Sequence, residues 1–125
     1  MRIVGIATLA LALAAPTVAL ADMDAGRKVY KKCVACHFVD KEQNKVGPHL
    51  VGLFGRKAGV LEGFAYSKAM QDYGVLWDAT TLDAYLEAPR KVVPGTKMAF
   101  AGLRKAEERA ALIEFLKEAT KPAGG

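Results

Sequence analysis

The sequence contains very little cysteine and histidine, which limits the kinds of site it can form. Only two of its 125 residues are cysteines and two are histidines, and both cysteines lie in the stretch CVACH at 33–37. A disulfide across two intervening residues would close a very small loop and stabilise little. A structural zinc ion needs four ligands, and His49 is the only further histidine. Both readings are therefore disfavoured.

The sequence also lacks a polybasic strip, an internal repeat, a domain linker and a convincing β-strand. Its net charge of +5 comes from 18 basic and 13 acidic residues, too small a difference for a dedicated nucleic-acid binder. Charged residues make up 25% and hydrophobic residues 52%, so the composition is neither disordered nor fibrous. A length of 125 residues indicates one domain.

The N-terminal region has the order of parts found in a secretory signal peptide. A basic residue precedes an apolar run over 3–13, Pro16 interrupts it, and a small-x-small site follows at 19–21. We predict that residues 1–21 are removed, that 22–125 form a single domain, and that the protein is exported to a bacterial periplasm. An uncleaved membrane anchor is the alternative, because the apolar region is about long enough to span a bilayer.

The rest of the sequence predicts an all-α domain of four or five short helices joined by long irregular loops. The first helix is expected to begin with Asp24 as its cap, and the last is expected over 105–119. Two more are expected over 67–73, capped by Ser67 and followed by Gly74, and over 80–87, capped by Thr80 or Thr81 and ended by Pro89. Because few large apolar residues can pack such loops, we expect a large apolar cofactor to complete the core.

The CVACH stretch fits the attachment of a haem better than a redox dithiol. A dithiol motif is expected at the start of a helix that follows a strand, whereas this stretch follows a helix. In haem attachment Cys33 and Cys36 add to the vinyl groups and His37 supplies an imidazole to the iron. The sequence therefore predicts one covalently attached haem c.

The second axial ligand decides between electron transfer and chemistry at an open iron position. Four side chains could supply it, namely Met23, His49, Met70 and Met98. Met98 is favoured because the loop at 94–98 lies far along the chain and could reach the opposite face of the haem. A haem enzyme or a gas-binding sensor with an open sixth position remains the alternative.

The chain resembles the class I cytochromes c, both the mitochondrial type and the small soluble bacterial proteins of the cytochrome c-two type. The resemblance covers nearly all of 22–120, and its strongest parts are CVACH at 33–37 and the stretches 46–50, 53–57, 63–67 and 94–102. It implies about five short helices and irregular loops wrapped around one covalently bound haem, with the first and last helices crossing. It also implies that Met98 is the axial methionine.

The resemblance implies roles for further residues of the haem pocket. The Pro48 carbonyl would accept a hydrogen bond from His37, the Tyr85 hydroxyl would reach the Met98 sulfur, and Thr96 would support a haem propionate or an internal water. Residues expected to hold the propionates are Arg56, Tyr66 and Trp77.

Other implied contacts lie where the first and last helices cross, and they involve Gly26, Tyr30 and Phe115. Met70 departs from the asparagine usual in the family, so an internal water network is expected to differ. Tyr30 and Phe115 exchange the aromatic types usual in mitochondrial members, a change expected not to touch ligation.

The function implied is that of a one-electron carrier rather than an enzyme, acting as a monomer with no small-molecule substrate. The electron donor would be a ubiquinol–cytochrome c oxidoreductase, and the acceptor a terminal oxidase or a photosynthetic reaction centre. A basic ring would steer the protein to acidic docking faces in short-lived encounters. The positions that match this ring are Lys32, Arg90, Lys91, Lys97, Arg104 and Lys105.

Overall fold

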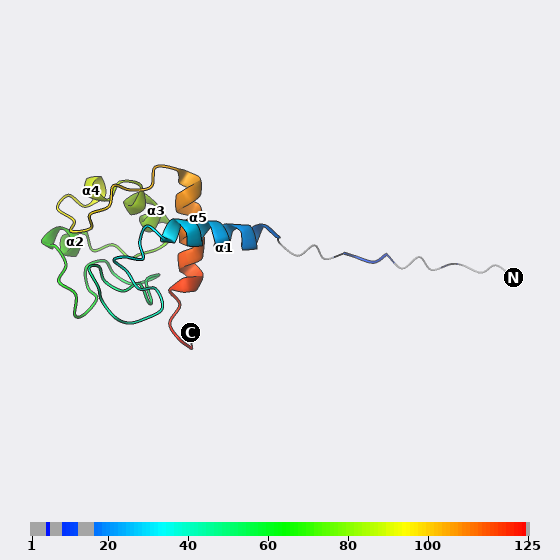
Figure 1. The fold of residues 1–125 in the computed structure, drawn as a ribbon, viewed down its shortest axis with the longest axis horizontal. Helices are drawn as coiled ribbons and strands as arrows, with labels where there is room; N and C mark the ends of the chain where they lie inside the picture. Colours follow the sequence, from blue (N-terminus) through cyan, green and yellow to red (C-terminus); the bar gives the residue numbers. More distant parts are fainter. Residues whose placement is uncertain (1–4, 6–8, 13–16, 125) are drawn as a thin grey trace.

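The computed structural model describes residues 5, 9–12 and 17–124 (Figure 1). In these residues it has five helices and no β-strand, with one isolated antiparallel bridge between Lys57 and Leu76. The helices are α1 (Thr17–Tyr30), α2 (Lys68–Tyr73), α3 (Ala79–Glu87), α4 (Pro89–Val92) and α5 (Ala106–Ala119). The prediction of an all-α domain with about five short helices is confirmed.

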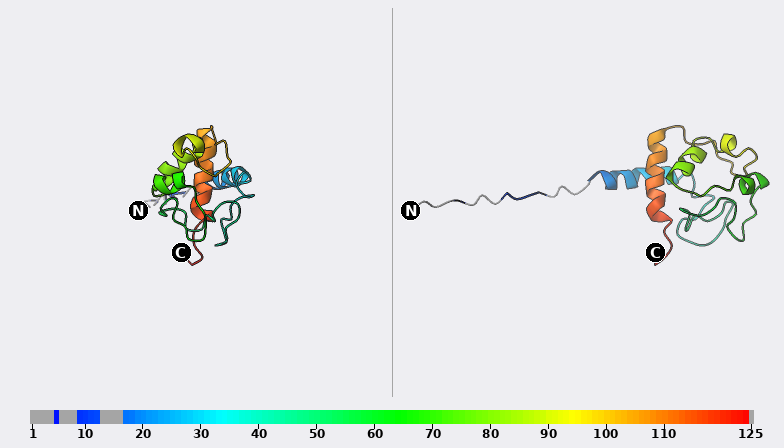
Figure 2. Two further views of the ribbon diagram at one scale, coloured as in Figure 1. Left: turned by 90° about the vertical axis from the view of Figure 1, so that its left-hand side faces the viewer. Right: turned by 180° about the vertical axis from the view of Figure 1, so that it is seen from behind.

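The helices α1 and α5 cross and pack against each other, as the views in Figures 1 and 2 show. The crossing depends on Gly26, because a Cβ there would meet the backbone oxygen of Ala111 and lie 2.5 Å from the Cβ of Phe115. Tyr30 packs on Phe115 at the same crossing, with 5.4 Å between ring centroids. The first and last helices therefore form the frame to which the loops attach.

The ends of the two central helices follow local capping chemistry. Ser67 caps α2 by accepting a hydrogen bond from the Met70 N–H at 3.1 Å, and Gly74 ends it in the left-handed conformation. The expected cap of α3 at Thr80 or Thr81 was wrong. Asp78 is the cap, and it forms a capping box with Thr81 because each side chain binds the other's backbone N–H.

Two boundaries differ from the prediction. Pro89 follows α3 but also begins α4, because proline has no N–H to lose in a first turn and its fixed φ suits a helix start. The helix α1 begins at Thr17 rather than after a cap at Asp24, because the intervening residues include strong helix formers such as alanine and leucine. Among the described residues, no helix is long and apolar enough to cross a membrane.

The buried core lies between the helical frame and the loops over 31–67 and 93–105. Trp77 and Tyr85 are buried side by side, with 5.3 Å between ring centroids, and Leu112 of α5 is 1% exposed. The segments around Arg56 and Trp77 are tied together by backbone hydrogen bonds, including Trp77 N–H to Arg56 O at 2.9 Å. These elements surround a cavity rather than filling the centre completely.

Candidate functional site

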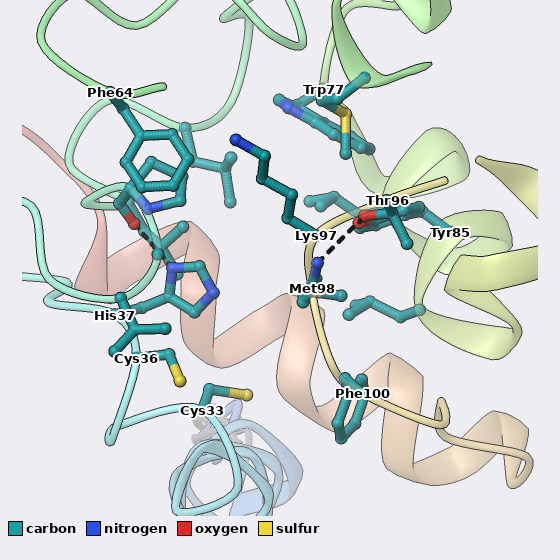
Figure 3. A pocket seen from close by; sticks show the side chains of 18 of the residues that line it. Cys33, Cys36, His37, Phe64, Trp77, Tyr85, Thr96, Lys97, Met98 and Phe100 are labelled. Atoms are coloured by element: carbon teal, nitrogen blue, oxygen red, sulfur yellow. Dashed lines mark hydrogen bonds between the residues drawn. The ribbon is translucent and has the colours of Figure 1, made fainter. Parts of the chain in front are cut away.

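A cavity at the centre of the domain is lined by the predicted site residues. Its volume is about 250 Å³, near the lower end of the roughly 300–1,000 Å³ typical of ligand pockets. In Figure 3 Cys33, Cys36 and His37 lie on one side, and the segment with Thr96 and Met98 lies on the other. The predicted pocket and ligand residues that line it are Cys33, Cys36, His37, Pro48, Arg56, Tyr66, Trp77, Tyr85, Thr96 and Met98.

The two cysteines are placed by tight turns that follow α1. The Cys33 N–H binds the Tyr30 carbonyl at 2.8 Å, and the N–H groups of Cys36 and His37 both bind the Cys33 carbonyl at 3.0 Å. Both thiols are free. Burial, with a smaller contribution from Cys36, raises the pKa of Cys33 to about 11. A redox dithiol needs a lowered thiol pKa, so the site does not have the electrostatics of one.

The ring of His37 is held so that one nitrogen is left for the cavity. Its Nδ1 lies 2.6 Å from the Pro48 carbonyl oxygen, which can only accept, so Nδ1 carries the proton and donates. The other nitrogen, Nε2, then has a free lone pair, as a metal ligand requires. Gly47 packs against the ring, because a Cβ there would lie 2.5 Å from His37 Cε1. Burial lowers the pKa of His37, which favours the neutral ring.

The opposite wall is the loop that carries Met98. The Thr96 hydroxyl oxygen lies 2.9 Å from the Tyr85 hydroxyl and accepts a hydrogen bond from the Met98 N–H at 3.3 Å. The Tyr85 hydroxyl is thus paired with Thr96, and its expected contact with the Met98 sulfur stays a prediction. Thr96 therefore holds the Met98 backbone, and Tyr85 supports Thr96.

Of the four candidates for a second ligand, Met98 and Met70 line the cavity. Met70 belongs to α2 and is 9% exposed, which fits packing in the core. His49 is buried but does not line the cavity, and its Nδ1 has no hydrogen-bond partner among the residues that the structure describes. Met23 packs against the hydrophobic core from α1. The position of Met98 across from His37 makes it the better candidate.

A half-buried arginine provides positive charge within this largely apolar site. The Arg56 guanidinium donates to the carbonyls of His49 at 3.0 Å and Val51 at 3.2 Å, which fixes its position. Tyr66 lines the same cavity, and burial raises its pKa, so its hydroxyl stays protonated. These groups can donate to a carboxylate, and burying such a charge requires donors.

The donor set fits a covalently attached haem. Two thiols and an imidazole with a free Nε2 lie on one wall, a thioether lies on the other, and the lining between them is mostly apolar. Within 17–124 no group of three or more His, Cys, Asp or Glu side chains could hold a bare metal ion. The site is therefore suited to an iron that brings its own four nitrogen ligands.

The six residues proposed for partner docking, Lys32, Arg90, Lys91, Lys97, Arg104 and Lys105, are all exposed. Lys32 and Lys97 also line the cavity, and Lys97 Nζ donates to the Ala65 carbonyl at 3.0 Å.

Sequence reasoning missed two contacts around His37. The Tyr30 hydroxyl donates to the His37 carbonyl oxygen at 2.6 Å, so the aromatic exchange at the helix crossing does reach the ligand segment. The close packing of Gly47 on the His37 ring was also not foreseen. Tyr30 and His37 are seven residues apart, about two helical turns, which suggested that they could be close in space. The hydroxyl contact itself could not be predicted, because it depends on the conformation of the turn after α1.

Comparisons with known proteins agree with this site. The family model for cytochrome c matches residues 23–120. Cytochrome c type-1 of Ascaris suum is 49% identical over 107 residues, covering 85% of this chain and 96% of that protein. Cytochrome c of Chlamydomonas reinhardtii is 52% identical over 101 residues, covering 79% and 90%. Cytochrome c of Gibberella zeae is 49% identical over 102 residues, covering 80% and 96%.

The organisms of these relatives overturn the predicted location. They are a nematode, a green alga and a fungus, and further relatives of similar identity come from the plants Sesamum indicum and Stellaria longipes. These are eukaryotes, whose cells have no bacterial periplasm. The prediction of a periplasmic location was wrong, because a signal-like N-terminus does not by itself specify a compartment.

The match to the family covers most of this chain and most of each relative. The family model spans well over half of the chain, and the relatives are matched over nearly their whole lengths. Cytochromes c carry one covalently bound haem c and transfer electrons in respiratory chains. The chain belongs to the cytochrome c family.

Proposed function

We propose that this electron carrier binds its haem through Cys33 and Cys36, with His37 and Met98 as the axial ligands of the iron. The observation that supports this most is that Cys33, Cys36 and His37 lie on one wall of a cavity and the Met98 loop lies on the opposite wall (Figure 3). Such an iron, when bound, supplies one-electron oxidation and reduction, and a His/Met ligand pair raises its potential.

The residues of the chain hold and shield this centre. Pro48 orients the His37 ring, and Thr96 holds the Met98 backbone. The apolar lining disfavours the extra positive charge of the oxidised state, which raises the potential further. Donors such as Arg56 compensate the carboxylates of the propionates.

The proposed partners are membrane redox complexes. A ubiquinol–cytochrome c oxidoreductase would be the donor, and a terminal oxidase or a photosynthetic reaction centre the acceptor. The exposed cations support encounters with acidic docking faces, which are fast and sensitive to salt. We also propose that the protein acts as a monomer.

Charge reversal tests the docking proposal. In the Lys91→Glu and Arg104→Glu variants, the second-order rate of oxidation by a purified acceptor should fall about tenfold at low salt, because electrostatic steering is lost. The difference should fade as salt screens the charges. Lys121→Glu, which changes the net charge equally but near the C-terminus, is the matched control. Equal effects of all three variants would contradict a localised docking surface.

The removal of residues 1–21 remains a proposal. The helix α1 runs from Thr17 across the predicted cleavage point, and the family model begins at residue 23. The intact mass of the protein purified from its own cells tests this directly. A haem-containing mass that starts at Asp22 is expected, and the full-length mass would contradict it.

A further inference from the structure

The last residue of α1 makes a direct contact with the segment that carries the proposed iron ligand. The Tyr30 hydroxyl donates to the His37 carbonyl oxygen at 2.6 Å, and the tyrosine itself is 8% exposed. Its ring packs on Phe115 of α5. Tyr30 thus contacts both the helix crossing and the backbone of His37.

The neighbouring carbonyls of the ligand segment have other donors. The Cys36 carbonyl accepts from the Gly47 N–H at 2.9 Å, and the Phe38 carbonyl accepts from the Leu50 N–H at 2.8 Å. Those two bonds come from the loop at 47–50, which also supplies the Pro48 carbonyl to the His37 ring. The carbonyl between them, that of His37, receives its hydrogen bond from α1 instead.

His37 is consequently fixed at three polar groups. Its N–H binds the Cys33 carbonyl at 3.0 Å, its ring Nδ1 binds Pro48, and its own carbonyl binds Tyr30. Only the last of these contacts depends on a side chain of the helical frame. Removing the Tyr30 hydroxyl would leave the partly buried His37 carbonyl without this donor. An unpaired buried acceptor costs more free energy than replacing both partners by apolar groups.

We propose that Tyr30 is a positioning residue for His37, because its hydroxyl holds the backbone carbonyl of the iron ligand from the end of α1. This inference rests on the proposed function, in which His37 binds the iron. A phenylalanine at this position would keep the aromatic packing of the crossing but could not hold the His37 backbone.

The test compares Tyr30→Phe with Phe115→Leu in the haem-loaded protein. Tyr30→Phe removes only the hydroxyl, whereas Phe115→Leu reduces packing at the same crossing and keeps the hydroxyl. Two measurements separate the roles, namely the paramagnetically shifted NMR signals of the His37 side chain in the oxidised protein and the hydrogen exchange of the His37 and Gly47 amides.

Tyr30→Phe should move the His37 signals and speed exchange of these two amides by about 10- to 100-fold, as expected for the loss of a buried hydrogen bond. Phe115→Leu should speed exchange throughout α1 and α5 and leave the His37 signals in place. Unchanged His37 signals and exchange in Tyr30→Phe, or equal shifts in both variants, would overturn the proposal. If the parent protein shows no paramagnetically shifted His37 signals, the ligand assignment fails instead.

Discussion

At the residue scale, the two walls of the cavity differ in how firmly they hold the proposed ligands. His37 has hydrogen bonds at its N–H, its carbonyl and its ring. Met98 has its N–H bonded at 3.3 Å to Thr96, whose hydroxyl lies 2.9 Å from that of Tyr85. The methionine side is therefore the one expected to yield first when the ligation is disturbed.

The substitution Met98→Ala should open the sixth position of the iron. The variant should bind carbon monoxide when reduced, and its reduction potential should fall by on the order of 0.1 V or more, because the axial ligand is a main determinant of potential. Absorption spectroscopy with carbon monoxide and a redox titration measure these effects. Met70→Leu is the matched control, because it also removes a thioether from the cavity lining. Carbon monoxide binding by Met70→Leu but not by Met98→Ala would reverse the assignment.

The substitution Gly47→Ala should disturb the other wall. The added Cβ would lie 2.5 Å from His37 Cε1, so either the ring or the loop must move. We expect a loss of about 1–3 kcal/mol in the free energy of unfolding, as for other overpacked sites, together with altered signals from the His37 ring. Denaturant unfolding and NMR check this. Ala35→Gly, at an exposed position of the CVACH stretch, serves as a control for changes outside the contact.

Residue types and their order predicted much of the site. The contacts that depend on the distances between atoms of different loops could not be predicted. CVACH and the loop methionine were recognisable because their chemistry is carried by residue types and order. The partner of Tyr85 was not predictable, because Thr96 and Met98 are two residues apart and only the loop geometry decides which one the hydroxyl reaches. The hydrogen bond from Tyr30 to His37 could not be predicted for the same reason.

At the scale of elements, the crossing of α1 and α5 is the contact on which the frame depends. The backbone of Ala111 approaches α1 so closely at Gly26 that no side chain fits. Elsewhere in a helix an alanine would be favoured over glycine by about 1 kcal/mol, so the glycine is retained for the approach and not for the helix.

Gly26→Ala should therefore destabilise the protein although it improves helix propensity. The two helices must separate, and we expect a loss of about 1–3 kcal/mol or more in the free energy of unfolding. Thermal or denaturant unfolding of the haem-loaded protein measures it. Ala25→Ser, at the exposed neighbouring position of α1, should change stability by less than about 0.5 kcal/mol. A stabilised Gly26→Ala variant would contradict the packing described here.

The cap of α3 gives a pH-dependent prediction. The hydrogen bond from the Thr81 N–H lowers the pKa of Asp78 below its ordinary value of 3.8. A lowered folded-state pKa means that the stabilisation is present above pH 3.8 and is lost as the pH falls through the lowered value.

Asp78→Asn keeps a capping side chain but cannot titrate. Its free energy of unfolding should be lower than that of the parent at neutral pH, and the difference should shrink as the pH falls below 3.8. Urea unfolding at several pH values measures this. A difference that is independent of pH would contradict a charged cap at Asp78.

The position of α2 was predictable from its cap at Ser67, and that of α5, which has no side-chain cap, from its apolar periodicity. The start of α1 was not, because strong helix formers before Asp24 continue the helix past a plausible cap. At α3 two adjacent threonines and an aspartate all offered capping oxygens, and backbone geometry selected Asp78. A proline that can end one helix and begin another, such as Pro89, carries both signals at once.

At the scale of the whole molecule, the centre of the domain is a cavity and not a closed core. Helices and loops contribute apolar residues to its lining, including Leu53, Leu82 and Leu112. The cofactor is therefore expected to supply much of the contact that holds the loops to the helical frame, which explains how a chain with few large apolar residues can fold.

Removing the attachment should accordingly unfold the loops. In a Cys33→Ala/Cys36→Ala variant, which cannot form the covalent links, we expect loss of most helical circular dichroism signal in the haem-free protein. The parent, when haem is attached, should unfold cooperatively with its full helical signal. A haem-free variant with native helical content and a sharp unfolding transition would show that the core does not depend on the cofactor.

The central claim is that this chain holds a haem between His37 and Met98. The most direct measurement is the absorption spectrum of the purified protein, oxidised and then reduced, with and without carbon monoxide. We predict a c-type reduced spectrum, a weak far-red band from methionine–iron ligation in the oxidised form, and no change with carbon monoxide. A spectrum that shifts with carbon monoxide would contradict the second ligand, and a protein matured without any haem would contradict the whole account.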